Sequence, residues 1–194
     1  MSADWQQRFV VGISGASGIV YGVTALRILR ELGFETHLVM SKSARLTLSY
    51  EMSIDAKEVD ALASVVHGVG DIGASIASGS FRVRGMLVAP CSIKSLSEIA
   101  YGTTSNLLSR AADVTLKERR RLVLMVRETP LHSGHLRAMT LVTEAGGIIM
   151  PPVPAFYARP QSIEDMVEHS VGRALDLFDI ESSVVRRWNP QLKS

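Results

Sequence analysis

Short apolar runs alternate with amphipathic stretches along the whole chain. The apolar runs predict strands over residues 9–13, 36–40, 85–89, 122–126 and 147–150. The stretches between them predict helices over 19–32, 43–51, 55–65, 107–119, 133–144 and 162–177, with one more beginning at Pro90-Cys91-Ser92. Gly33 stands where a glycine commonly ends a helix, directly after the first of these.

This alternation of strands and helices predicts an α/β fold: a single doubly wound, Rossmann-like parallel sheet flanked by helices. The 194 residues suit one domain, covering residues 1–194. Run 122–126 is apolar at every position, as in parallel strands buried on both faces. Ligands of such sheets bind beyond the carboxyl ends of the strands, so we expect the functional residues directly after each strand.

The composition narrows the possible partners and the compartment. The net charge is +2, and no basic stripe with interleaved aromatic residues indicates nucleic acid as a partner. Cys91 is the only cysteine, which fits a reducing compartment. With neither a signal-peptide pattern at the N-terminus nor an apolar run of about 20 residues, we expect a cytoplasmic protein without a membrane partner. A mean hydropathy of +0.18 favours some apolar surface buried between subunits.

The small residues Gly12–Gly18 after the first strand suggest a phosphate cradle, because they let backbone amides and a helix N-terminus approach an anion. The loop is neither a Walker loop nor a regular dinucleotide fingerprint. Ser41-Lys42 ends the second strand where nicotinamide-binding folds place an acidic residue, which suits a phosphate or a polar flavin edge. The alternative is that Ser41 only caps the next helix.

Charged residues supply the remaining candidates. Arg110, Asp113 and Lys117 share one helix face, either as an ion-pair row or as a cationic wall for a substrate phosphate. Arg127-Glu128 directly follows the most buried strand, where unused charge is costly, so Glu128 is the candidate acid/base group.

Three other features carry weaker expectations. We expect Cys91 to be a packed small hydrophobe and His132-x-x-His135 to hold no metal. Tyr157 and Arg159 lie in a proline-framed loop that could close over a site.

Seven blocks, in this order and spacing, make the chain resemble the flavin prenyltransferases of the UbiX/Pad type. They lie at residues 15–22, 37–42, 78–81, 90–94, 110–120, 127–131 and 151–162, and the resemblance extends from Val11 to Trp188. It implies transfer of a dimethylallyl group from dimethylallyl monophosphate to N5 and C6 of reduced FMN, with release of phosphate and without a metal. It further implies that the product, prenylated FMN, passes to a UbiD-type decarboxylase, and that the subunits form a dodecamer with sites between them.

The resemblance also assigns residues. It places the flavin on Gly15, Ala16, Ser17, Ser41, Ser92, Ile93, Lys94, Ser95 and Arg127. It places the prenyl phosphate on Ser78, Arg110, Lys117, Tyr157 and Arg173, with Trp188 near the site. Ser17 and Glu128 match a catalytic pair that relays protons, and Glu51 matches a carboxylate contributed by a neighbouring subunit.

Two alternatives remain. One is an FMN-dependent decarboxylase of the same fold, acting on cysteine-containing peptides or pantothenoyl-cysteine. Its asparagine-rich segment is missing here, and it would leave the cationic set without a use. The other is a non-catalytic flavin carrier subunit that supports a partner decarboxylase, which would leave Glu128 and the prenyl-phosphate residues unexplained.

Overall fold

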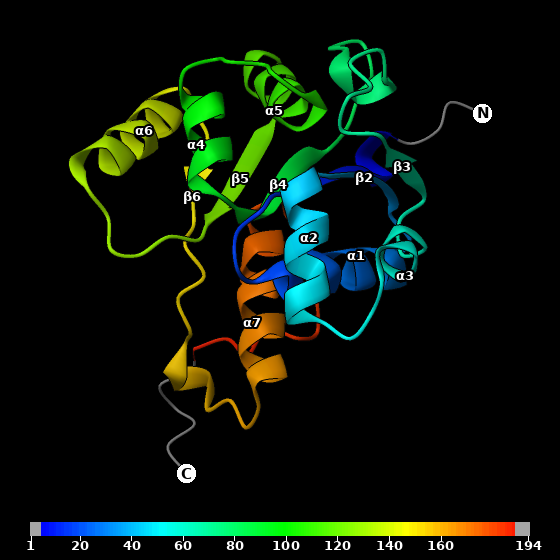
Figure 1. Ribbon diagram of the computed structural model, residues 1–194. Helices are drawn as coiled ribbons and strands as arrows, with labels where there is room; N and C mark the ends of the chain where they lie inside the picture. Colours follow the sequence, from blue (N-terminus) through cyan, green and yellow to red (C-terminus); the bar gives the residue numbers. More distant parts are fainter. Residues whose placement is uncertain (1–4, 189–194) are drawn as a thin grey trace.

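The computed structural model describes residues 5–188, which are organised around one six-stranded parallel sheet (Figure 1). The strand order β3-β2-β1-β4-β5-β6 starts at β1 in the middle and winds outward in both directions, which confirms the doubly wound topology. All five neighbouring pairs are parallel. The strands are β1 (Arg8–Ile13), β2 (Glu35–Met40), β3 (Val65–His67), β4 (Gly85–Cys91), β5 (Arg121–Val126) and β6 (Ile148–Ile149).

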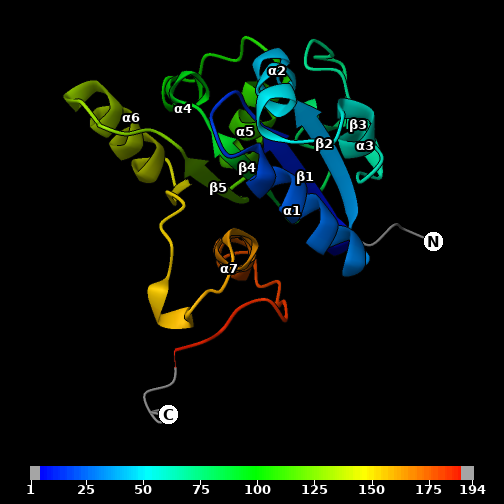
Figure 2. The same cartoon turned by 60° about the horizontal axis from the view of Figure 1, so that its bottom comes forward.

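Helices cover both faces of the sheet (Figure 2). Alternate strand residues point to opposite faces, so Val11 joins one apolar core and Val10 the other. The first core packs against α1 (Ile19–Glu31), α2 (Lys42–Glu51), α3 (Ala56–Asp60) and α7 (Ile163–Asp176). The second packs against α4 (Ile93–Ala100), α5 (Leu107–Lys117) and α6 (Ser133–Glu144). Short 3-10 turns are η1 (Trp5–Gln7), η2 (Ser75–Ala77) and η3 (Phe156–Ala158).

The predicted helix over 55–65 is wrong in its second half. Asp55 and Glu58 form a capping box that starts α3 correctly, but the helix ends at Asp60. Ser64 then exchanges two hydrogen bonds with Thr36 on β2, each 3.1 Å, and residues 65–67 pair with β2 as the edge strand β3. The hydrophobic pattern of the sequence did not predict β3, because this strand forms through its pairing with β2.

Other boundaries shift by a few residues. Pro90 and Cys91 belong to β4 and do not start the next helix, because β4 continues along β5 until Cys91 pairs with Val126. Ser92 is the residue that caps α4. Of the predicted strand 147–150 only Ile148–Ile149 pairs, and α5 ends at Lys117, two residues before Arg119 adopts a positive φ of 56°.

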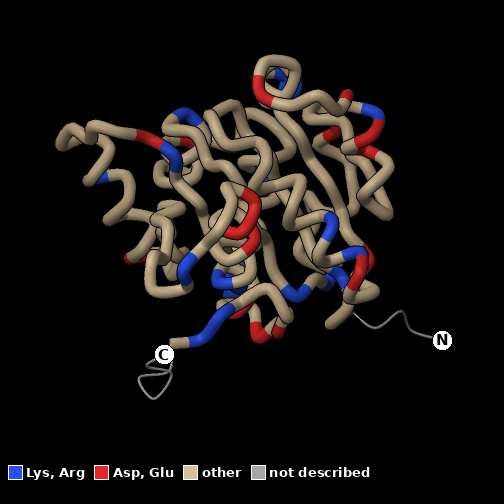
Figure 3. The backbone as a smooth tube through the Cα atoms, turned by 90° about the horizontal axis from the view of Figure 1, so that it is seen from below, with Lys and Arg blue, Asp and Glu red and all other residues tan. Residues whose placement is uncertain are grey.

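Gly33 follows the C-cap of α1 with a φ of +78°, as expected for a glycine that ends a helix. Basic and acidic residues alternate along the backbone, and neither kind is confined to one part of the fold (Figure 3). Within residues 5–188, none of the helices combines the length and the apolar character that crossing a bilayer requires.

Candidate active site

A cavity of about 400 Å³ lies beyond the carboxyl ends of β1, β2, β4 and β5, at the edge of the sheet where ligands were expected. It brings together most residues that were predicted to hold the flavin, together with the candidate acid/base group. The predicted residues in its lining are Gly15, Ser41, Ser92, Ile93, Lys94, Ser95 and Glu128.

Serine side chains cap two of the helices that begin at this cavity, α2 and α4. Ser41 Oγ accepts a hydrogen bond from Ala44 N at 3.0 Å and caps α2, and Ser92 Oγ accepts one from Ser95 N at 3.3 Å and caps α4. Ser41 therefore caps a helix, as one interpretation held, and it also lines the cavity, while its contact with a phosphate or a flavin stays a prediction. The positive ends of two helix dipoles lie beside the cavity, an arrangement that favours a bound anion.

Ser14 ties the ends of β1 and β4 together beneath the cavity. Its hydroxyl donates to the carbonyl of Pro90 at 3.0 Å and accepts from the amide of Ser92 at 2.7 Å. The side chain is buried, so this link fixes the spacing of the two loops that follow the strands.

At the start of α1 the small-residue loop contacts a carboxylate of its own chain, and its role as a phosphate cradle stays a prediction. Glu51 Oε2 accepts from the amides of Gly18 at 2.8 Å and Ile19 at 3.0 Å, so a carboxylate of this chain already occupies the start of α1. Gly18 has a φ of +99°, where a side chain would be strained. A Cβ at Gly15 would lie 2.4 Å from Cβ of Ser43, so the loop packs directly against α2.

Glu51 is held in its charged form. Burial of the carboxylate raises the pKa of Glu51, but hydrogen bonds from Ser17 and two backbone amides, with the charge of Arg127, outweigh it and leave this pKa below its ordinary value. The same Arg127 partly offsets the effect of burial, which raises the pKa of Tyr21. Ser17, Glu51 and Arg127 therefore form a polar cluster at the loop that carries Gly15. Within one chain the Glu51 carboxylate contacts its own loop, and its expected contribution to the site of a neighbouring subunit stays a prediction.

Glu128 follows β5 at the cavity, and its carboxylate accepts a hydrogen bond from the amide of Thr129 at 3.0 Å. The side chain is exposed. A carboxylate that lines a cavity in this way can take a proton from a bound molecule or return one, and the acid/base role of Glu128 stays a prediction.

One half of the predicted prenyl-phosphate set lies with α5. Arg110 donates through Nε to the carbonyl of Ala77 at 3.3 Å and pairs with Asp113 at 2.7 Å, beside Ser78 in the loop after η2. Lys117, one residue before the C-cap of α5, forms an ion pair with Glu118. The loop packs against this pair, because a Cβ at Gly79 would come within 2.7 Å of Lys117 Nζ.

The other half lies on the opposite face of the sheet, with α7 (Figure 2). The rings of Tyr157 and Trp188 meet edge to face with centroids 5.7 Å apart. Arg173 pairs with Asp176 at 2.6 Å, and Asp176 also holds Arg187 at 3.0 Å. Within one chain, Tyr157 and Trp188 contact each other on the α7 side of the sheet. Arg110 and Lys117 lie with α5 on the other side, so the two groups do not meet.

Four residues in the lining of the cavity were not predicted from the sequence: Ser43, Glu98, Asn106 and Leu108. Asn106 caps α5 and donates from Nδ2 to Glu98 at 3.0 Å, which fixes the wall of the cavity. A polar residue just before an apolar helix is a recognisable cap signal, so Asn106 could have been found. Leu108 carries no such signal, because its position depends on how α5 packs.

The part of the chain that the structure describes contains no cluster of three or more His, Cys, Asp or Glu side chains suited to a metal ion. Cys91 is fully buried, and burial raises the pKa of its thiol strongly, which matches the expected packed side chain.

Comparison with known proteins identifies the family of the chain. The family model "Flavoprotein" matches residues 2–185. The flavin prenyltransferase UbiX of Escherichia coli K12 is 58% identical over 185 residues, covering 94% of this chain and 98% of the relative. The chain belongs to the UbiX-type flavin prenyltransferase family.

Solved UbiX structures share the fold closely. A crystal structure of AnUbiX in complex with FMN and dimethylallyl pyrophosphate is 53% identical, with a TM-score of 0.93, over 95% of this chain and 98% of that one. A dodecameric FMN-dependent UbiX-like decarboxylase from Escherichia coli O157:H7 is 47% identical, with a TM-score of 0.92, over 94% of this chain and 99% of that one.

Proposed function

We propose that this protein transfers a dimethylallyl group from dimethylallyl monophosphate to reduced FMN, at N5 and C6, and releases prenylated FMN and inorganic phosphate. The observation that carries the proposal is the cavity at the carboxyl edge of the sheet, in a chain 58% identical to a flavin prenyltransferase. Two capped helix N-termini suit the FMN phosphate, while Ser17, Glu51 and Arg127 supply polar groups for the flavin ring.

The residues present fit both substrates. The reduced flavin supplies the nucleophilic positions. The protein must stabilise the negative charge that develops on the departing phosphate, and donors such as Arg110, Lys117 and Arg173 can do so electrostatically. A proton must also leave C6, and Glu128 lies at the cavity where it can accept this proton. We assign Ser17 to the same proton relay, because it already hydrogen-bonds Glu51.

We further propose that the complete site is shared between copies of this chain in a homo-oligomer. Arg110 and Lys117 lie on one face of the sheet and Tyr157 and Arg173 on the other, so one chain alone does not surround one phosphate with all four. Assembly into a dodecamer, as in the UbiX-like structure from Escherichia coli O157:H7, would let different copies supply the two groups.

We also propose that the protein works in the cytoplasm and passes prenylated FMN to a UbiD-type decarboxylase. The handover rests on membership of the family, and the location rests on the single cysteine, which suits a reducing compartment. The transfer can be tested by adding the reaction mixture to a flavin-free UbiD-type decarboxylase and measuring carbon dioxide release. Decarboxylation that needs the protein and both substrates supports the handover, whereas release that is equal with FMN alone contradicts it.

The deciding experiment incubates the protein anaerobically with reduced FMN and dimethylallyl monophosphate, and analyses the released flavin by mass spectrometry. We expect a mass gain of one prenyl unit on FMN, with one phosphate released for each flavin modified. Unmodified FMN from folded, flavin-loaded protein would contradict the proposal and favour the carrier or decarboxylase alternatives.

A matched pair of lysine variants distinguishes a prenyltransferase from a non-catalytic flavin carrier. Lys117→Ala removes a proposed phosphate ligand, whereas Lys57→Ala removes an exposed lysine on α3, away from the cavity. We expect Lys117→Ala to raise the KM for dimethylallyl monophosphate at least tenfold while FMN still binds, and Lys57→Ala to behave like the wild type. A carrier subunit would respond to neither change.

A further inference from the structure

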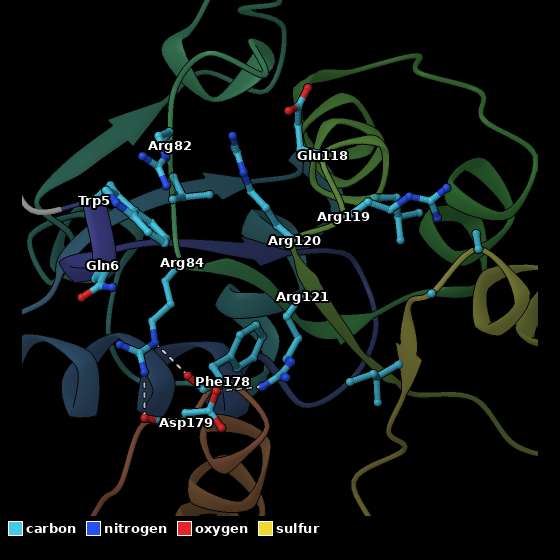
Figure 4. Close-up of a pocket in the computed structure, with 15 residues that line it drawn as sticks. Trp5, Gln6, Arg82, Arg84, Glu118, Arg119, Arg120, Arg121, Phe178 and Asp179 are labelled. Atoms are coloured by element: carbon cyan, nitrogen blue, oxygen red, sulfur yellow. Dashed lines mark hydrogen bonds and ion pairs between the residues drawn. The ribbon is translucent and has the colours of Figure 1, made fainter.

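A second and larger cavity, of about 860 Å³, lies at the opposite edge of the sheet from the flavin cavity (Figure 4). Its walls come from η1, from the segment that leads into β4, from the turn between α5 and β5, and from the segment after α7. The two cavities share no lining residue, although Glu118 in the lining of the second pairs with Lys117 of the proposed prenyl-phosphate set.

The lining of this cavity is strongly positive. It contains five arginines against two carboxylates, Glu118 and Asp179. Glu118 is already paired with Lys117, and the side chain of Asp179 is 80% exposed, so it is well screened by water. The five arginines are Arg82, Arg84, Arg119, Arg120 and Arg121.

Neutral carbonyl groups hold two of these arginines in place. Arg84 donates to the carbonyl oxygens of Phe178 at 2.7 Å and Asp179 at 2.8 Å (Figure 4). Arg120 donates to those of Phe81 at 2.8 Å and Gly79 at 2.6 Å. A carbonyl orients a guanidinium without cancelling its charge, so these cations are preorganised and remain available to an anion.

Arg121 and Arg82 are also held in place, each by different groups. Arg121 donates to the carbonyl of Leu177 and pairs with the exposed Asp179 at 3.2 Å. Arg82 lies over the ring of Trp5, 4.2 Å from its centroid, which leaves the edge of its guanidinium free to donate (Figure 4).

We propose that this cavity binds a small polyanion with two or more phosphate groups, of the size of a nucleoside diphosphate or triphosphate. Guanidinium groups match phosphate oxygens in a two-pronged geometry, and several fixed arginines favour a ligand with several charges. The volume lies within the range of pockets that hold cofactor-sized ligands. This inference does not depend on the proposed prenyl transfer.

Titration with inorganic triphosphate tests the proposal. The protein is first saturated with FMN and dimethylallyl monophosphate, so that the phosphate positions of the active site are filled, and binding is followed by calorimetry in about 50 mM NaCl. We expect saturable binding that weakens as the salt concentration rises. Absence of saturable binding would overturn the proposal, whether the cavity has no affinity or another copy covers it.

Arginine variants locate the binding. Arg82 and Arg119 are exposed, and the double variant Arg82→Gln/Arg119→Gln removes two charges without touching the carbonyl contacts of Arg84 and Arg120. We expect it to weaken triphosphate binding at least about tenfold while prenyl transfer is unchanged. Arg137→Gln, an exposed arginine on α6, is the matched control and should bind like the wild type.

Two results would contradict the assignment. Unchanged triphosphate affinity in Arg82→Gln/Arg119→Gln would place the binding elsewhere. Tighter binding of a polyglutamate peptide than of triphosphate would make the cavity a surface for an acidic protein segment. Loss of prenyl transfer in every protein, with triphosphate binding intact, would contradict the proposed function alone.

Discussion

Glu51 lies 33 residues after Gly18 in the chain, and its carboxylate caps the N-terminus of α1. It accepts hydrogen bonds from the backbone amides of Gly18 and Ile19. A carboxylate at this end of a helix satisfies backbone donors and interacts favourably with the helix dipole. The negative charge at the start of α1 therefore comes from a side chain of the protein, the Glu51 carboxylate. Beside it, Ser17 and Arg127 complete a polar cluster whose charge balance depends on Glu51 staying ionised.

Glu51→Gln should lower the free energy of unfolding of the ligand-free protein by about 0.5–1 kcal/mol at neutral pH, since the amide still accepts a hydrogen bond but the charge is lost and solvent screens the site. The pKa of Glu51 is lowered in the folded state, so its contribution is fully present above the ordinary value of 4.5 and is lost as the pH falls through the lowered value. Denaturant titrations from neutral to acidic pH should show the two proteins converging. A difference that grows on acidification would contradict this.

Glu128→Gln should retain FMN binding and slow prenyl transfer by about 10²–10⁴-fold, because it removes the group proposed to accept the proton from C6. Single-turnover kinetics with reduced FMN measure the effect. Glu144→Gln, an exposed carboxylate at the end of α6, is the control. Wild-type turnover in Glu128→Gln would remove Glu128 from the mechanism.

Helix α1 and strand β3 show how elements are held on the sheet. α1 lies so close to β4 that a Cβ at Gly22 would come within 2.3 Å of the carbonyl oxygen of Ala89. β3 is held partly by side chains: His37 Nδ1 and His67 Nε2 are 2.9 Å apart, and His37 Nε2 lies 3.0 Å from Glu35 Oε1. Since Nε2 of His37 donates to Glu35, its Nδ1 accepts from His67.

Gly22→Ala should destabilise the protein by about 1–3 kcal/mol, because overpacking against a backbone carbonyl exceeds the helix propensity that alanine gains. Chemical denaturation measures the change. Gly70→Ala is the matched control: its Cβ meets nothing within 4 Å and its φ is not positive, so we expect little effect. Equal stability of the two variants would show that α1 can shift away from β4.

The histidine pair should make stability fall as the pH drops below about 6.5. Burial lowers the pKa of His37, although Glu35 raises it, and burial with the charge of His37 lowers the pKa of His67, although Asp71 raises it. Between these lowered values and the ordinary 6.5, the unfolded chain binds more protons, so acidification favours unfolding by up to about 1.4 kcal/mol per proton and pH unit.

His67→Gln should therefore lose less stability than the wild type between about pH 7.5 and about pH 5.5, as measured by urea titrations at both values. His132→Asn, at the start of α6 and away from β3, is the control and should keep the wild-type pH dependence. An unchanged pH dependence in His67→Gln would show that the pair does not govern the edge of the sheet.

At the scale of the whole molecule, the sheet separates the two groups of proposed phosphate ligands. α5 carries Arg110 and Lys117 on one face, and α7 with the C-terminal segment holds Arg173 and Trp188 on the other. This separation is the reason for the proposal that a complete phosphate site takes residues from two copies of the chain. Contacts between copies would also bury apolar surface. The mean hydropathy is +0.18, and apolar side chains such as Phe156 and Ile163 are 73% and 74% exposed in one chain.

Co-assembly of two weakened variants tests shared sites. Lys117→Ala and Arg173→Ala subunits, expressed together in equal amounts and assayed at low dimethylallyl monophosphate, should show about a quarter of the wild-type activity if each site takes Lys117 and Arg173 from different copies that mix at random. Each variant alone should show no more than about a tenth of it. If both residues served a site within one chain, every site would carry a defect and the mixture would be no more active than the single variants.

The sequence by itself determined the features that depend on neighbours along the chain. Hydrophobic periodicity predicted the parallel α/β sheet, and cap residues such as Ser41, Ser92 and Gly33 marked helix ends, because backbone conformation responds to nearby side chains. The blocks of the resemblance indicated the family. Only the tertiary structure decided which distant groups meet: Glu51 at the start of α1, β3 against β2, the arginines of the second cavity, and the separation of Lys117 from Arg173. Those contacts arise from the packing of whole elements on the sheet, which no local pattern encodes.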